Sequence, residues 1–163
     1  VGIGQGYTLS TPLQLANFAA TLATRGRRFV PQLVNFVGGE RLNPVELPPV
    51  LVAEKNWNIM HDAMLEVVHG ERGSARTMGE GLKYLVAGKT GTAQVIGVAQ
   101  GEFYDEENVD ERHRNHGLFI AFAPAESPTI ALAVVVENGG SSLAALPIAR
   151  AVIDSWLSER GEV

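Results

Sequence analysis

"YLVAGKTGTAQV", residues 84–95, carries the most specific chemistry in this sequence. A short apolar run leads into Gly-Lys-Thr-Gly-Thr at 88–92, and the chain then becomes apolar again. Such a run bounded by glycines predicts a buried strand, here over residues 84–96, interrupted at its glycines. A lysine and two threonines that alternate with glycines at the end of a strand could bind one of two kinds of ligand, a phosphate or a carboxylate.

The spacing of the glycines argues against phosphate. In the phosphate-binding pattern G-x-x-x-x-G-K-[ST], the first glycine would fall at position 83, which is Lys83. That loop must also open a helix, whereas residues 93–96 favour a strand. The glycines at 2, 4 and 6 miss the dinucleotide-binding pattern, which needs a glycine where Tyr7 stands.

A carboxylate ligand fits better. A strand edge with Lys89 and Thr90 offers a fixed cation, a hydroxyl donor and backbone N–H groups to a ligand that lies along the strand. An extended peptide ending in a carboxylate would dock there as an added strand, and glycine at 91 would keep side-chain atoms out of its approach. The alternative is a glycine-rich strand end with a solvated lysine.

Two further strands are expected at 117–124 and 129–138, because both runs are apolar on both faces. The four residues between them suit an antiparallel hairpin. "ENGG" at 137–140 is interpreted as a strand end and turn, with a contribution to the rim of the cleft as the alternative. Short strands are expected near 28–36. The fold class predicted is α+β, an antiparallel sheet flanked by helices.

Helices are expected over about 12–25, 54–68 and 144–159, with one possible helical turn at 73–78. The second helix is predicted to bury one face, which comprises Trp57, Met60 or His61, Met64 and Val67–Val68. The last helix is predicted to pack through the face that comprises Ile148, Ala151 or Val152, Ser155 and Trp156. Residues 97–116 are polar and predict a solvated segment.

Composition excludes several classes of function. The formal net charge of −5, from 13 Lys+Arg against 18 Asp+Glu, gives no basic footprint, so nucleic acid is not an expected partner. The absence of cysteine excludes disulfides, thiolate metal sites and a cysteine nucleophile. No apolar run approaches the roughly 20 residues that span a bilayer. His113 and His116 lie among acidic residues and predict a solvated loop rather than a metal site.

"KTGTAQV" closely resembles the transpeptidase domain of class B penicillin-binding proteins. Lys-Thr-Gly is one of three motifs of the serine acyl transferases that include these proteins and the class A β-lactamases. Four other stretches match in the family's order: GIGQGYTLSTPLQLA (2–16), GSA (73–75), HRNHGLFIAFAP (113–124) and VVVENGG (134–140). The resemblance covers essentially the whole chain, is strongest to the elongation-specific class, and implies the penicillin-binding protein/β-lactamase-like fold.

The resemblance also implies roles for the residues of the motif. Lys89 would orient the catalytic centre and attract the substrate carboxylate, and Thr90 would hydrogen-bond that carboxylate. The backbone N–H of Thr92 would be one donor of the oxyanion hole, usually the largest single contribution in acyl transfer. The strand would pair with the peptide backbone. The implied substrate-binding residues are Lys89, Thr90, Gly91, Thr92, Ala93 and Gln94.

The other two motifs of the family are absent from these residues. None of the lysines, Lys55, Lys83 and Lys89, has a serine three positions before it, so the nucleophilic Ser-x-x-Lys is missing. No serine stands two positions before an asparagine, so Ser-x-Asn is missing too. In the family both motifs lie upstream. We therefore expect residues 1–163 to be the C-terminal portion of a single transpeptidase domain that cannot acylate alone.

The resemblance implies a peptidoglycan D,D-transpeptidase that works through an acyl-enzyme, without a metal or other cofactor. The expected partners are peptidoglycan stem peptides, β-lactams as covalent inhibitors, the missing N-terminal half of the same domain and membrane proteins of the elongation complex. The expected location is the periplasmic face of the bacterial inner membrane, held by an upstream anchor. The alternatives are a β-lactamase or D,D-carboxypeptidase of the same fold, or a non-catalytic sensor or scaffold that binds β-lactams or muropeptides.

Overall fold

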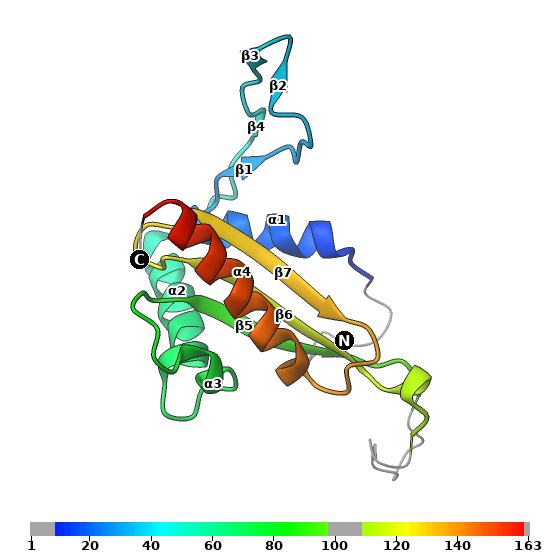
Figure 1. Cartoon of the computed structure of the whole chain (residues 1–163). Coiled ribbons are helices and arrows are strands. Elements are labelled where there is room, and N and C mark those ends of the chain that lie inside the picture. The colour runs from blue at the N-terminus through cyan, green and yellow to red at the C-terminus, as the bar shows by residue number, and fades with distance from the viewer. Residues whose placement is uncertain (1–8, 98–108, 162–163) are drawn as a thin grey trace.

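The computed structural model of this chain describes residues 9–97 and 109–161 (Figure 1). The glycines at 2, 4 and 6 and most of the polar segment 97–116 lie outside the described residues. Within the described part, no helix is both long enough and apolar enough to cross a membrane.

An antiparallel three-stranded sheet forms the centre of the fold, as predicted. Its strands are β5 (Ala87–Ala93), β6 (His116–Ala123) and β7 (Ile130–Val136), in the spatial order β5-β6-β7. β5 is shorter than the strand predicted over 84–96. The register explains its end, because Ala93 pairs with His116, the first residue of β6, and residues beyond Ala93 have no partner on that strand.

Helices cover both faces of the sheet (Figure 1). On one face, α1 (Pro12–Ala23) and α2 (Glu54–His69) bury a cluster against the sheet. On the other face lie α4 (Leu146–Glu159), the short 3-10 helix η3 (Ser142–Ala145) and α3 (Arg76–Gly79). Phe119 and Phe122 are fully buried on opposite sides of β6 and belong one to each cluster.

The beginning of α1 follows the sequence signals. Thr11 and Gln14 form a capping box at the start of α1, where Pro12 occupies the first turn. α1 ends before Gly26, whose φ of 99° suits glycine. His61 rather than Met60 belongs to the buried face of α2, and its Nε2 donates to the carbonyl oxygen of Leu22 at 2.7 Å, which ties α2 to α1.

The predicted packing face of α4 is wrong. The buried residues are Leu146, Ala149, Ile153 and Leu157, whereas Ile148, Ala151, Val152, Ser155 and Trp156 are exposed. The reason lies in Arg150 and Asp154, which flank Ile153. The apolar pattern treats these two as solvent-facing residues, but both bond to other elements. Arg150 donates to the carbonyl oxygens of Met78 and Glu80, and Asp154 accepts from Tyr84.

Residues 28–47 form an arm that projects away from the sheet and its helices (Figure 1). It consists of two small antiparallel pairs, β1 (Arg28–Phe29) with β4 (Glu46–Leu47), and β2 (Phe36–Val37) with β3 (Glu40–Arg41). The prediction of short strands in this part of the chain is confirmed. A last short 3-10 helix, η2 (Glu111–His113), precedes β6.

Candidate active site

β5 carries the Lys-Thr-Gly motif along one edge of the sheet. Among the described strands it pairs only with β6, so its other edge is open to an added strand. Backbone groups just before β5 show which residues face that edge. The N–H of Val86 points away from β6 to His69 Nε2 at 3.0 Å, whereas the carbonyl of Leu85 points inward and accepts from Ala125. Because alternate residues of an antiparallel strand share a direction, the backbone groups of Thr90 and Thr92 face the open edge.

The side chains of Lys89 and Thr90 leave the strand on opposite faces. Lys89 lies two residues after Ala87, which is buried on the face of α1 and α2, and Thr90 lies four after Val86, which is buried on the face of α4. The lysine nevertheless reaches the edge, where its Nζ donates to the carbonyl oxygen of Thr90 at 2.9 Å. The ammonium and the hydroxyl therefore flank one open strand edge. Lys89 is exposed and Thr90 half-buried, so both can meet a ligand.

The hydroxyl of Thr90 has a partner that the sequence did not indicate. Ser74, in the turn between α2 and α3, lies with its Oγ 2.8 Å from Thr90 Oγ1. Ser74 was part of the matching stretch GSA, but that resemblance assigned it no role. The sequence separation gives no sign that the two hydroxyls meet.

The two glycines of the motif have different surroundings. A Cβ at Gly88 would overlap the ring of Phe119, so the packing of β6 on β5 requires glycine there. A Cβ at Gly91 would meet only Leu118 Cβ, at 3.4 Å, which is an ordinary van der Waals contact. The internal packing of the chain therefore leaves room for a side chain at 91. This is consistent with the prediction that Gly91 keeps the approach of a ligand clear.

The start of β5 is tied to α4 through Tyr84. Its hydroxyl donates to Asp154 Oδ1 at 2.7 Å, and Arg150 Nε donates to Asp154 Oδ2 at 2.8 Å. Burial and the hydrogen bond to Asp154 raise the pKa of Tyr84 well above its ordinary value. Burial alone would raise the pKa of Asp154, but the hydrogen bonds from Tyr84 and Arg150, with the charge of Arg150, outweigh it and hold that pKa below its ordinary value.

A turn at 137–140 lies beside the other end of β5, because β6, which it contacts, begins opposite Ala93. Asn138 has a φ of 55° and donates through Nδ2 to the carbonyl oxygens of Arg112 and Arg114, at 2.9 and 3.0 Å. Its backbone N–H donates to His116 Nδ1 at 2.9 Å. The predicted strand end and turn at ENGG is thus confirmed. The prediction that His116 lies in a solvated loop is wrong, because His116 is the half-buried first residue of β6 and its ring accepts this bond.

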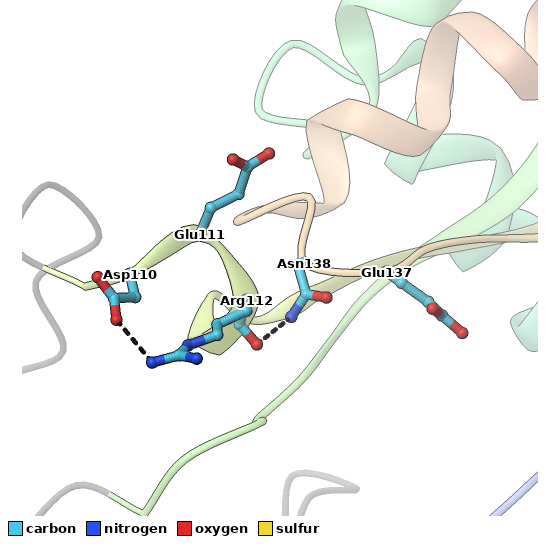
Figure 2. Close-up of a pocket in the computed structure, with 5 residues that line it drawn as sticks. All are labelled: Asp110, Glu111, Arg112, Glu137 and Asn138. Carbon is cyan, nitrogen blue, oxygen red and sulfur yellow. Dashed lines mark hydrogen bonds and ion pairs between the residues drawn. The ribbon is translucent and has the colours of Figure 1, made fainter.

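A cavity of about 610 Å³ lies beside this turn. Figure 2 shows the residues that line it. Asp110, Glu111, Arg112, Glu137 and Asn138 line it. Arg112 pairs with Asp110 at 3.3 Å, so one carboxylate of the lining is compensated. The described residues contain no group of three or more histidine and acidic side chains placed to hold a metal ion. A contribution of the turn to the rim of a cleft stays a prediction.

The structure brings most of the predicted site residues onto one strand. Lys89, Thr90, Gly91, Thr92 and Ala93 belong to β5. Gln94 is exposed and follows the last residue of β5, so it lies beyond the paired part of the strand. The roles that the resemblance implies for these residues stay predictions.

Comparison with known proteins shows the family to which a chain with this fold and this site on the edge of β5 belongs. Residues 1–154 match the family model described as the penicillin binding protein transpeptidase domain. The chain therefore belongs to the penicillin-binding protein transpeptidase family, as the motifs around Lys89 predicted.

Individual relatives agree with this family membership. The chain is 41% identical over 165 residues to the peptidoglycan D,D-transpeptidase MrdA of Acinetobacter baumannii, covering 98% of this chain and 24% of the relative. It is similar to the crystal structure of Pseudomonas aeruginosa PBP2 in complex with WCK 5153, with 42% identity and a TM-score of 0.79 over 96% of this chain and 32% of that one. It is also similar to the complex between PBP2 and MreC from Helicobacter pylori, with 28% identity and a TM-score of 0.73 over 99% of this chain and 27% of that one. The chain spans about a quarter of the length of the curated relative.

Proposed function

We propose that this chain forms the Lys-Thr-Gly wall of the active site of a peptidoglycan D,D-transpeptidase. The observation that carries the proposal is the open edge of β5, where the Lys89 ammonium and the Thr90 hydroxyl flank outward-facing backbone groups. Membership of the penicillin-binding protein transpeptidase family and similarity to a D,D-transpeptidase support it.

In this proposal a stem peptide lies along β5 as an added strand. The Thr90 hydroxyl donates to its terminal carboxylate, and Lys89 supplies the positive charge that attracts it. The Thr92 N–H faces the same edge and is one donor to the carbonyl oxygen under attack. Ala93 contributes backbone pairing, and Gln94 contacts the peptide just past the end of the strand.

The nucleophile comes from outside these 163 residues, because they contain no Ser-x-x-Lys. A serine hydroxyl attacks the penultimate D-Ala carbonyl of the stem peptide, forms an ester and expels the terminal D-Ala, whose amine takes up a proton. An amine of a neighbouring strand then attacks the ester, which forms the cross-link and returns the proton to the serine. β-Lactams imitate the D-Ala-D-Ala end and acylate the same serine.

The proposal extends to partners and location. The remaining part of the transpeptidase domain completes the cleft, membrane proteins of the elongation complex bind the whole protein, and the enzyme works at the periplasmic face of the bacterial inner membrane. The solved complex of a similar PBP2 with MreC supports a partner of this kind. The naming of a relative as a transpeptidase favours this activity over a β-lactamase, a D,D-carboxypeptidase or a non-catalytic sensor.

The test is the rate at which a fluorescent penicillin acylates the intact protein of which these residues are part. Lys89→Ala should slow acylation at least 100-fold and leave the melting temperature nearly unchanged, since the side chain is exposed. Lys55→Ala removes another exposed lysine, at the start of α2, and is the matched control that should acylate normally. Equal acylation of the two variants would refute the proposed role of the site.

A further inference from the structure

We propose that Ser74 is a positioning residue that directs the hydroxyl of Thr90 toward the substrate carboxylate. The inference rests on the proposed function, in which Thr90 binds that carboxylate. Ser74 Oγ lies 2.8 Å from Thr90 Oγ1, which is the usual length of a hydrogen bond between two hydroxyls. The two residues come from different elements, the α2–α3 turn and β5.

The number of protons that the two hydroxyls can donate determines what this contact does. Each hydroxyl has one proton to donate and two lone pairs to accept with. When Ser74 donates to Thr90, the oxygen of Thr90 is satisfied and its single proton is left for another acceptor. A carboxylate at the strand edge takes that proton and favours this arrangement, because a hydrogen bond to an ionised acceptor is roughly twice as strong as a neutral one. The pair then acts as a chain from Ser74 through Thr90 to the ligand.

The turn that carries Ser74 is held by other interactions than this hydroxyl bond. A Cβ at Gly73 would overlap the carbonyl oxygens of Glu66 and Val67, so the turn packs directly on the end of α2. Ala75 is fully buried, and its N–H donates to the Val67 carbonyl oxygen at 2.9 Å. The backbone of Ser74 is thus held in place by its two neighbours in sequence, Gly73 and Ala75, while its own side chain stays exposed.

Because Gly73 and Ala75 hold the turn, the side chain of Ser74 is not needed for the fold, and a positioning role for Ser74 can be told apart from a structural one. Because an exposed bond between neutral hydroxyls adds little to stability, removing it should leave the fold intact. Thr90 is β-branched and restricted at χ1, so the partner of its hydroxyl governs mainly where the proton points. The predicted cost of losing Ser74 therefore falls on ligand binding.

The experiment measures acylation of the intact protein by a fluorescent penicillin and by the methyl ester of the same penicillin. Ser74→Ala should slow acylation by the carboxylate form about tenfold and by the ester less than twofold, with a melting temperature within about 3 °C of the parent protein. Ser74→Thr keeps a hydroxyl and should restore most of the rate. Thr90→Val removes the partner and should show the same selective loss for the carboxylate form.

A double variant supplies the decisive control. If Ser74 acts through Thr90, adding Ser74→Ala to Thr90→Val should change the rate less than twofold. An unchanged rate in Ser74→Ala, equal slowing with acid and ester, or independent effects in the double variant would each overturn the inference while leaving the proposed function standing. A parent protein that is not acylated, or a Lys89→Ala variant acylated normally, would instead refute the proposed function, and the role of Ser74 would fall with it.

Discussion

The ring of Phe119 in β6 fills the space that a side chain at Gly88 in β5 would need. Phe119 is fully buried in the cluster on the α4 face of the sheet, so its ring can shift only by disturbing that packing. Gly91 lies three residues further along the same strand, and its nearest neighbour would be Leu118 Cβ at 3.4 Å. Two glycines of one motif therefore serve different purposes, the first in packing and the second at the open edge.

Alanine substitutions should separate these two purposes. Gly88→Ala should destabilise the protein by about 1–3 kcal/mol, because the added methyl group forces the ring of Phe119 to shift. Gly91→Ala should change stability by less than about 1 kcal/mol but slow acylation of the intact protein by a penicillin, since the methyl group enters the path of the ligand. Thermal unfolding and acylation rates measure both effects. Normal acylation of Gly91→Ala would mean that the ligand does not approach this residue closely.

The buried face of α4 leads to a second pair of variants. Ile153 is fully buried and Ile148 is 47% exposed, although the sequence favoured Ile148. Ile153→Ala should lower the free energy of unfolding by about 2–5 kcal/mol, and Ile148→Ala by less than about 1 kcal/mol. Chemical denaturation of the two variants measures the difference. A larger loss for Ile148→Ala would show that the predicted face, and not the observed one, packs in solution.

The α4 error shows where sequence patterns reach their limit. Ile148, Val152 and Trp156 form one apolar stripe of the helix, and Ala149, Ile153 and Leu157 form another beside it. The sequence pattern alone favours burial of the stripe with the larger side chains. Which stripe is actually buried depends on tertiary contacts. The deciding contacts involve Arg150 and Asp154, whose partners Met78, Glu80 and Tyr84 lie some 70 residues earlier in the chain.

The hydrogen bonds of Asp154 with Tyr84 and Arg150 predict that the stability of the fold depends on pH. Since the pKa of Asp154 in the folded chain lies below its ordinary value of 3.8, its carboxylate contributes stability that is present above about pH 4 and is lost as the pH falls through the lowered pKa. Asp154→Asn should cost about 1 kcal/mol at pH 7, a modest value because the side chain is 44% exposed. The difference from the parent protein should shrink toward pH 3. A constant difference across that range would show that Asp154 does not stabilise the fold through its charge.

Tyr84 predicts a loss of stability at high pH, in contrast to the loss at low pH expected from Asp154. Its pKa is raised above the ordinary value of 10.0, so the unfolded chain ionises first and the stabilising contribution of Tyr84 is lost as the pH rises above 10. Tyr84→Phe should be less stable than the parent protein at pH 7 and lose less stability between pH 9 and 11. Parallel stability curves of the two proteins over that range would contradict the assignment. Urea titrations at stepped pH values measure the curves.

Asn138 allows a test of the turn beside the cavity. Its positive φ suits glycine, whereas its Nδ2 bonds to the carbonyl oxygens of Arg112 and Arg114 need asparagine. Asn138→Gly removes only the bonds, and Asn138→Ala also strains the backbone. Both variants should be less stable than the parent protein, and the free energy of unfolding of the alanine variant should be about 1 kcal/mol lower than that of the glycine variant. Equal stability of the alanine and glycine variants would mean that the backbone relaxes from its positive φ.

Part of the candidate site could be predicted because its signal is local. Lys89, Thr90 and Gly91 stand together in sequence, and strand geometry alone puts their backbone at an edge once β6 pairs on the other side. The contact of Ser74 with Thr90 could not be predicted in this way. It depends on the close packing of Gly73 against α2, which brings the turn to the strand, and no spacing rule encodes that approach.

Covalent labelling by a fluorescent penicillin tests the central claim most directly, because the claim is that these residues hold a substrate which a serine elsewhere attacks. The intact protein and the 163-residue chain would be incubated with the probe, denatured and compared by gel fluorescence and mass spectrometry. We predict stable labelling of the intact protein on a serine outside residues 1–163, and no labelling of the 163-residue chain. A covalent adduct on the 163-residue chain, or an intact protein that remains unlabelled, would contradict the claim.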